Sequence, residues 1–225
     1  MIPSETLSQF GTPITALTQI SFQCQHCGEC CRNRAGSPIA LTGYDMYRLA
    51  GALGMRSTMD LLEAHIVSVM PNSYRLPICV LSVTPEGACC LLDGNDCAVH
   101  NVNPAVCTLY PLGRVYDAEE GCYAYIQPHG NCCQGTSKGR AVAAVHWIEG
   151  MKKTADLYAA CEQAYAEVAK AFLEITSNHY LERTFYRTTW ALFGGFNPKK
   201  DFLPQLEENL CGLRPLLKKA IRKSR

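Results

Sequence analysis

The pattern of apolar positions predicts a first helix over residues 42–54. Thr42 is a residue type favoured at a helix N-cap, and Asp45 falls in the first turn, where its charge suits the helix dipole. Gly54 suits the C-terminal cap. Between these caps apolar side chains recur every three or four residues, as one buried helix face requires: Met46, Leu49, Ala50 and Leu53.

The following segment predicts a second helix that ends before Pro71. Ser57 and Asp60 form a starting signal, and apolar side chains follow at helical spacing: Leu61, Leu62, Ile66 and Val69. The chain then changes to β-branched and aromatic runs that favour short strands, namely residues 74–83, 110–117 and 122–128.

From about residue 139 onward the pattern is helical. One long apolar stripe has i, i+3, i+4 and i+7 spacing: Tyr158, Cys161, Tyr165, Val168, Ala169, Phe172 and Ile175. A Gly-Gly-Phe-Asn-Pro turn at 194–198 precedes a last helix over about 201–223. We therefore predict an α+β fold, in which a small cysteine-rich domain with short strands and two helices precedes a mostly helical C-terminal region.

These elements divide the chain into three parts. Residues 1–21 show little periodicity and are expected to form an irregular N-terminal arm. Residues 22–150 form the cysteine-cluster domain, and residues 151–225 form a helical region packed on it. The 225 residues suffice for one substantial core with an appended subdomain.

Composition and charge exclude several classes of function. Hydrophobic residues make up 48% of the chain and charged residues 18%, as in globular proteins. The net charge of +1 gives no overall field that would attract nucleic acid or an acidic membrane. The N-terminus lacks the pattern of a secretory signal, and no apolar run reaches transmembrane length. We expect a cytoplasmic protein with no nucleic-acid or membrane partner; a protein partner or protein substrate is compatible with these features.

The 14 cysteines dominate the candidate chemistry. In a reducing cytosol, clustered cysteines more often bind metal or take part in redox chemistry than form disulfides. Adjacent cysteines also bridge each other only with strain. Three cysteines on apolar faces are instead predicted to be plain buried thiols: Cys79, Cys161 and Cys211.

Most other cysteines form motifs with metal-binding spacing. Residues 24–31 read C-x-x-C-x-x-C-C, and residues 90–107 contain C-x6-C-x9-C, followed later by the adjacent pair in NCCQG. Thiolates bind soft and borderline metals, and short spacings let one loop offer several sulfur atoms to one centre. Eight such ligands would serve two four-coordinate sites or one larger cluster.

The spacing favours an iron–sulfur centre over zinc. Structural zinc ribbons normally carry two C-x-x-C knuckles, and the second is missing here. The C-x-x-C-x-x-C run instead resembles part of a ferredoxin-type loop with a remote fourth ligand. The alternative is zinc, which would act as a structural metal in a non-enzymatic interaction module. Three histidines are candidates for contacts with the metal or its sulfur ligands: His26, His100 and His129.

Four motifs resemble the YkgJ-type cysteine-cluster family, also called the CxxCxxCC zinc- or iron-chelating family. They are FQCQHCGECCR at 22–32, IALTGYDMYRLAGALG at 39–54, CCLLDGNDCAVHNVNPAVCTLYPLGR at 89–114 and CCQGTSKGRAV at 132–142. The resemblance implies a metal centre with eight ligands: Cys24, Cys27, Cys30, Cys31, Cys90, Cys97, Cys107 and Cys133. Cys89 and Cys132 leave the choice within two adjacent pairs open.

The resemblance implies little about the reaction. Family members have been described loosely as iron–sulfur oxidoreductases, and flagellin lysine methylases share a more distantly similar cysteine domain. We therefore expect a metalloprotein with a redox or protein-modifying role, and S-adenosylmethionine-dependent methylation is an alternative. The sequence departs from the family pattern at His100, where an aromatic residue is usual, and at Asn103, which replaces the usual arginine before Pro104.

Overall fold

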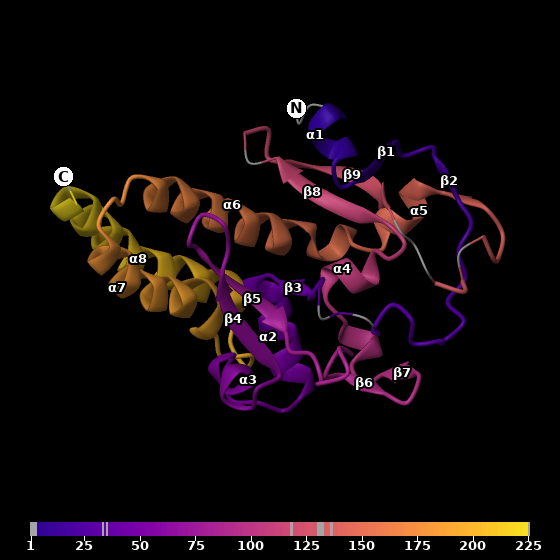
Figure 1. Ribbon diagram of the computed structural model, residues 1–225, viewed down its shortest axis with the longest axis horizontal. Coiled ribbons are helices and arrows are strands. Elements are labelled where there is room, and N and C mark those ends of the chain that lie inside the picture. Colours follow the sequence, from indigo (N-terminus) through magenta and orange to yellow (C-terminus); the bar gives the residue numbers. More distant parts are fainter. Residues whose placement is uncertain are drawn as a thin grey trace. The chain divides into compact units, whose positions relative to one another are not determined.

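Short antiparallel strands combined with helices form the protein, so the predicted α+β class is confirmed (Figure 1). The computed structural model describes residues 4–32, 34, 36–117, 119–129, 133–135 and 137–224. Every strand pair within these ranges is antiparallel, which is typical of α+β proteins.

The chain divides into two compact units, each built from two separate stretches of sequence. Unit 1 contains residues 1–38 and 83–159, and unit 2 contains residues 39–82 and 160–225. The cysteine motifs all belong to unit 1. The sequence pattern predicts three consecutive parts. In the structure, residues 39–82 of unit 2 lie in sequence between the two stretches of unit 1, and local sequence patterns do not indicate such an insertion.

A three-stranded sheet is the largest element of unit 1. Its strand order is β1 (Gly11–Ile14), β9 (Cys122–Pro128) and β8 (Gly113–Asp117). β8 and β9 lie where the aromatic and β-branched runs predicted strands. The Arg114 side chain on β8 lies between two tyrosine rings, 4.5 Å from the centroids of Tyr123 and Tyr158, a favourable cation–π arrangement.

The expectation of an irregular arm over residues 1–21 is wrong for the described part of that segment. α1 spans Ser4–Ser8, β1 pairs with β9, and β2 (Gln19–Ile20) pairs with β10 (Val142–Ala143). Strands this short contain too few residues to show an alternating pattern. Their partners lie more than a hundred positions away in sequence, so only the tertiary structure reveals the pairing.

The rest of unit 1 consists of a hairpin and short helices, and it contains an apolar cluster. β6 (Leu92–Asp93) pairs with β7 (Asp96–Cys97). The short helices are η1 (His100–Val102), α4 (Ala105–Thr108), α5 (Ala144–Glu149) and η2 (Lys152–Thr154). Phe22 and Trp147 pack against a buried cluster of Ile20, Leu112 and Ala144. Phe22 therefore lies in packed apolar surroundings two residues before the first cysteine.

Unit 2 combines a second three-stranded sheet with helices. The strand order is β3 (Ala40–Leu41), β5 (Pro77–Leu81) and β4 (Val67–Pro71). The helices are α2 (Gly43–Ala52), α3 (Met59–Glu63), α7 (Asn178–Thr189), the π-helix η3 (Trp190–Gly194) and α8 (Phe202–Ser224). α6 (Ala155–Leu173) begins in unit 1 and continues in unit 2.

The second predicted helix is shorter than expected. α3 ends at Glu63, and His65 adopts a φ of 56°, in the left-handed region that breaks a helix. The chain then forms β4, so Val69 lies in a strand and not on a helix. Over so short a run, the apolar residues after position 65 fit the helical spacing as well as the alternating spacing of a strand. Pairing with β5 selects the strand.

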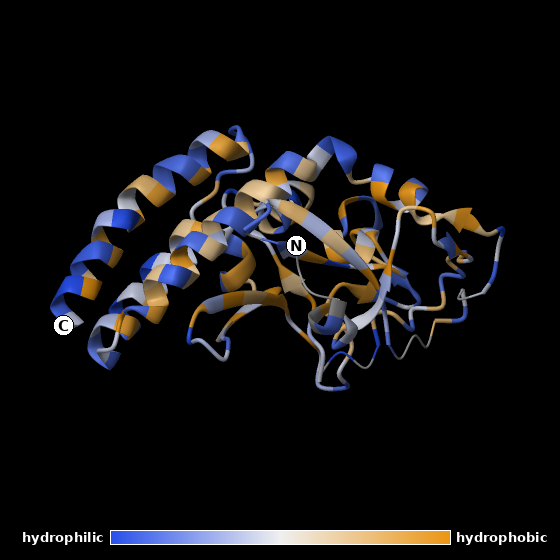
Figure 2. Ribbon diagram, turned by 90° about the horizontal axis from the view of Figure 1, so that it is seen from above, coloured by the Kyte–Doolittle hydropathy of each residue, from blue (hydrophilic) through white to orange (hydrophobic). Residues whose placement is uncertain are grey.

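The long C-terminal helices confirm the predicted helical region, and their polar faces alternate with apolar ones (Figure 2).

Two of the three predicted buried thiols are confirmed, since Cys79 and Cys161 are buried. The prediction for Cys211 is wrong, because this side chain is exposed. On α8 the neighbouring Leu210 and Leu213 are buried, and Cys211 falls outside the stripe that they share.

Thr42 and Asp45 form the predicted start of α2 as a reciprocal capping box. The Thr42 hydroxyl accepts a hydrogen bond from the Asp45 N–H at 3.2 Å, and the Asp45 carboxylate accepts one from the Thr42 N–H at 2.9 Å. Gly43, next to the cap, approaches η3 closely: a Cβ there would lie 2.3 Å from the Leu192 carbonyl oxygen. The capping box therefore orients a helix that packs tightly within unit 2.

We expect Thr42→Ala to lower the free energy of unfolding by about 1 kcal/mol, because the Asp45 N–H loses its acceptor. Urea denaturation followed by circular dichroism measures this change. Thr42→Ser keeps the hydroxyl and should stay close to the wild type. Equal loss in both variants would contradict the capping role.

Candidate metal centre

The first cysteine motif forms a turn that its own backbone stabilises. The N–H groups of Cys31 and Arg32 both donate to the Gly28 carbonyl, at 2.9 and 3.1 Å. Gly28 has a φ of 72°, which glycine adopts without the strain that a side chain would cause. The glycine of C-G-E-C-C therefore reverses the chain between Cys27 and Cys30.

The second cysteine motif lies directly against the first. The Cys89 N–H donates to the Cys31 carbonyl oxygen at 2.8 Å, and the Arg34 N–H donates to the Gly87 carbonyl oxygen at 2.6 Å. Cys89 also forms an isolated antiparallel bridge with Val83. These backbone contacts place the adjacent cysteines of one motif next to those of the other.

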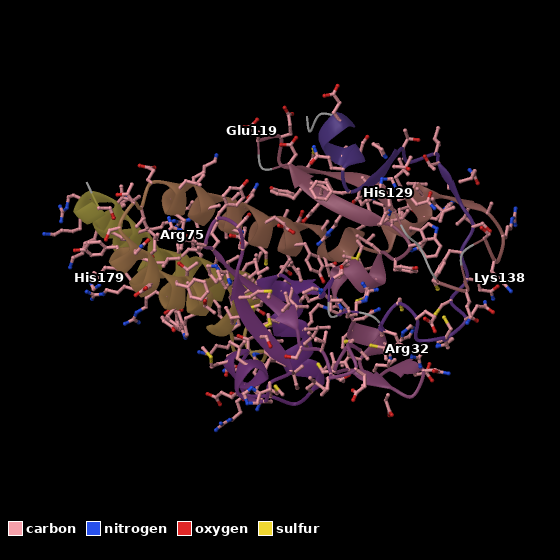
Figure 3. The ribbon with its side chains drawn as sticks, viewed as in Figure 1. Arg32, Arg75, Glu119, His129, Lys138 and His179 are labelled. Atoms are coloured by element: carbon pink, nitrogen blue, oxygen red, sulfur yellow. The ribbon has the colours of Figure 1, made fainter. Side chains whose placement is uncertain are left out.

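Arg32 connects the first motif to the hairpin β6–β7 (Figure 3). Its guanidinium donates to the carbonyl oxygen of Cys27, to that of Gly94 at 3.1 Å, and to the side-chain oxygen of Asn95. Cys97 is the last residue of this hairpin. The arginine thus positions the strand that carries Cys97 relative to the first motif.

The loop after Cys133 packs against the chain that enters the first motif. The Gln23 N–H donates to the Gly135 carbonyl oxygen at 3.2 Å, and the Ser137 N–H donates to the Ser21 carbonyl oxygen at 3.0 Å. Gly135 is required here, since a Cβ would lie 2.3 Å from the Gln23 carbonyl oxygen. The Gly135 N–H also points at the Cys133 sulfur, at 3.4 Å.

Cys30 and Cys31 have opposite electrostatic environments. Their sulfur atoms lie 3.9 Å apart. A hydrogen bond from the Cys31 thiol, helped by the Arg34 charge and opposed by burial, lowers the pKa of Cys30 to about 6. The same hydrogen bond and burial raise the pKa of Cys31, and the charges of Cys89 and Cys107 act in the same direction. Cys30 is therefore the thiolate of this pair near neutral pH.

The second adjacent pair repeats this arrangement. A hydrogen bond from the Cys90 thiol, with further help from Arg34, lowers the pKa of Cys89 to about 7. Burial raises the pKa of Cys97, and the charges of Cys89 and Cys30 raise it further. The mutual influence of Cys30, Cys89 and Cys97 shows that the first and second cysteine motifs contribute to one group of thiols.

Cys27 and Cys133 form a further pair. The Glu29 N–H lowers the pKa of Cys27, and a hydrogen bond with the Cys133 thiol contributes. Burial raises the pKa of Cys133, and the charges of Cys27 and Cys30 raise it as well. Cys133 therefore belongs to the same group of thiols as Cys27 and Cys30, although it lies about a hundred positions later in the sequence.

The structure gathers most, not all, of the cysteines expected to bind metal. Those that influence one another are Cys27, Cys30, Cys31, Cys89, Cys97, Cys107 and Cys133. Cys90 contacts Cys89, and Cys24 is exposed. Cys132 lies outside the described residues. Across the described ranges no three His, Cys, Asp or Glu side chains are placed so that they could hold a metal ion, and the individual ligands remain a prediction.

The histidines have other partners. His26 Nδ1 lies 2.9 Å from an Asp96 carboxylate oxygen on β7, and its ring centroid is 5.5 Å from that of His100. His129 Nε2 lies 3.3 Å from the carbonyl oxygen of Ser8. His26 therefore makes a second contact between the first motif and the hairpin, beside that of Arg32.

Cys89 and Arg34 are the residues that sequence reasoning undervalued. Cys89 is 3% exposed and donates the backbone hydrogen bond to Cys31, whereas the resemblance pointed to Cys90. Arg34 donates from Nε to the Cys30 carbonyl oxygen at 2.6 Å, in addition to its charge effects on Cys30 and Cys89. The adjacency of Cys89 and Cys90 was visible in the sequence, but burial was not.

Thiols drawn from separate loops supply the kind of donor atom that thiophilic metals prefer. A family model described as "CxxCxxCC: Putative zinc- or iron-chelating domain" matches residues 23–123. Residues 23–123 are therefore similar to this cysteine-cluster family, as the motifs suggested. Cys133 lies beyond the matched residues. Comparisons with curated proteins and with solved structures gave no match.

Within the described part of the chain, none of the helices has both the length and the apolar character needed to cross a membrane.

We expect Gly135→Ala to reduce the metal content of the purified protein by half or more, because the new Cβ forces the loop that carries Cys133 away from Gln23. Gly36→Ala is the matched control, since a Cβ at Gly36 meets nothing within 4 Å. Elemental analysis of both variants measures the effect. Equal metal content in the two would show that this loop does not position a ligand.

Proposed function

We propose that the thiols of unit 1 hold an iron–sulfur centre with a redox or protein-modifying role. The proposal rests on one observation: backbone hydrogen bonds place cysteines of separate sequence motifs next to one another, and their thiols influence one another's pKa values. A sulfur-only donor set suits iron–sulfur clusters and thiolate zinc sites, and the C-x-x-C-x-x-C spacing favours the former.

The residues around the thiols fit a centre of this kind. A group of thiolates carries negative charge, which Arg34 offsets beside Cys30 and Cys89. The N–H of Gly135 directed at the Cys133 sulfur is the kind of contact that tunes a sulfur ligand. When bound, an iron–sulfur cluster would supply one-electron chemistry, and the protein residues would set its potential and its access to solvent.

The ligands that we propose are those of the sequence prediction, with one change. They are Cys24, Cys27, Cys30, Cys31, Cys97, Cys107 and Cys133, together with Cys89 in place of Cys90. Three features support Cys89: its backbone contact with Cys31, its burial and the lowered pKa of its thiol. A thiol that ionises near neutral pH binds metal without a large cost of deprotonation.

Zinc is the second candidate, because four thiolates suffice for a structural zinc site and the matched family is described as zinc- or iron-chelating. In that case the metal would stabilise unit 1 as an interaction module without catalysis. The resemblance to flagellin lysine methylases is the sole basis of the methylase alternative. Titration of the metal-loaded protein with S-adenosylmethionine tests it, and absence of binding would remove it.

Anaerobic purification with iron, zinc and acid-labile sulfide analysis tests the proposal. We expect brown protein with visible absorbance and with sulfide in an amount similar to that of iron. Reduction by dithionite should bleach this absorbance, which measures the redox couple. Colourless protein with stoichiometric zinc would overturn the iron–sulfur assignment and establish the zinc module.

Cys89→Ser and Cys90→Ser separate the two adjacent thiols. We expect Cys89→Ser to lose half or more of the bound metal, because it removes a ligand, whereas Cys90→Ser should retain it. Cys79→Ser, which replaces a buried thiol of unit 2, controls for loss of a buried cysteine. Loss of metal in Cys90→Ser alone would reinstate the ligand set implied by the resemblance.

A further inference from the structure

A groove of about 420 Å³ lies on unit 2, between the end of α7 and one face of α8. The α8 residues in its lining recur at positions i, i+3, i+4, i+7, i+8 and i+11, so they form a single helix face. The described residues that line the groove are Arg187, Trp190, Ala191, Gly195, Lys200, Gln205, Glu208, Asn209, Gly212, Leu213 and Leu216. All of these residues belong to unit 2.

Trp190 forms an apolar wall that the backbone holds in place. It begins the π-helix η3, and the Gly195 N–H donates to its carbonyl oxygen at 2.7 Å. A Cβ at Gly195 would lie 2.9 Å from the indole ring, so glycine lets the ring pack against the backbone. Buried Asn209 donates to the carbonyl oxygens of Ala191 and Gly195, at 3.3 and 3.1 Å. π-Helical turns occur frequently at functional sites.

The groove stays open because α8 has a glycine in its middle. A Cβ at Gly212 would meet nothing within 4 Å, so no packing within the structure requires glycine at this position. Glycine in a helix interior is less favourable than alanine by about 1 kcal/mol. Trp190 and Leu216, on either side, remain 48% and 42% exposed. The groove therefore presents accessible apolar surface.

The charges at the groove favour an anionic occupant. Arg187 and Lys200 are both exposed, and neither side chain has an ion-pair partner among the residues that the structure describes. Glu208 is the carboxylate of the lining. The two cations leave the groove with a net positive charge, beside an indole ring and a leucine side chain.

We propose that this groove binds a peptide segment of a partner protein that carries an apolar side chain flanked by carboxylates. The apolar side chain would occupy the space above Gly212, between Trp190 and Leu216. The carboxylates would pair with Arg187 and Lys200. This site goes beyond the metal centre proposed above and does not depend on it.

A protein segment fits the groove better than a small ligand. Small-molecule sites normally bury most of their ligand in a concavity, whereas here the main apolar side chains stay about half exposed. Tryptophan and arginine are also enriched among the residues that contribute most to protein–protein binding. Two exposed cations beside an apolar wall add the charge complementarity that selects an acidic partner.

Selection of a random dodecapeptide display library against the metal-loaded protein tests this inference. We expect enriched peptides in which aspartate or glutamate flanks a large apolar residue. Calorimetry with the resynthesised peptides should show that Gly212→Leu weakens binding by about tenfold or more, because the leucine fills the space of the buried side chain. Leucine favours a helix more than glycine does, so unfolding does not explain such a loss.

Charge reversal tests the second half of the inference. Arg187→Glu with Lys200→Glu should weaken peptide binding by about threefold or more, with the effect decreasing at high salt. Lys170→Glu, at an exposed lysine on α6, is the control and should bind normally. Enriched peptides without carboxylates, no enriched peptide at all, or peptides that bind Gly212→Leu equally well would overturn the proposal. So would self-association of the wild type that Gly212→Leu abolishes, since it would assign the groove to a second copy of the chain.

The metal centre gives an independent outcome. Cys89→Ser should leave peptide affinity unchanged, because none of the described residues that line the groove is a cysteine. Failure of the iron–sulfur proposal would therefore not affect peptide binding, and failure of peptide binding would not affect metal content.

Discussion

The backbone hydrogen bond from the Cys89 N–H to the Cys31 carbonyl oxygen is the contact on which the candidate centre depends. Thiols repel one another once they ionise, and their side chains supply little apolar surface with which to hold loops together. Backbone pairing, which is independent of the protonation of the sulfur atoms, performs that task. The contact of Gln23 with Gly135 plays the same part at the other end of the group.

In unit 1, polar side chains also connect the loops that carry the cysteines. Arg32 connects the first motif to the β6–β7 hairpin, and His26 contacts the same hairpin through Asp96. Arg34 lies beside Cys30 and Cys89. In each pair one thiol donates to its neighbour, so that one sulfur atom ionises more easily. The arrangement offers thiolates near neutral pH, which a thiophilic metal needs in order to bind.

Unit 2 has a different character. Its helices pack by ordinary apolar faces, and Gly43 and Gly195 permit close approaches of backbone and ring. The groove beside Trp190 results from two locally unfavourable features, a π-helical turn and a glycine in the middle of α8. Such departures from regular structure often occur where a protein binds something. The chain thus combines residues that match a zinc- or iron-chelating family model with a unit that carries the groove for which we propose a peptide ligand.

The sequence alone determined the local features of this protein: the capping box at Thr42, the long C-terminal helices, the strands β8 and β9, and the cysteine motifs of the matched family. These depend on residues close in sequence, whose spacing is visible directly. Tertiary structure decided the strands before residue 21, the exposure of Cys211, the end of α3 and the burial of Cys89. The strands before residue 21 pair with partners more than a hundred positions away, α3 ends where the chain turns to pair β4 with β5, and the exposure of Cys211 and Cys89 depends on how their elements pack. Short segments carry too little periodicity to indicate such contacts.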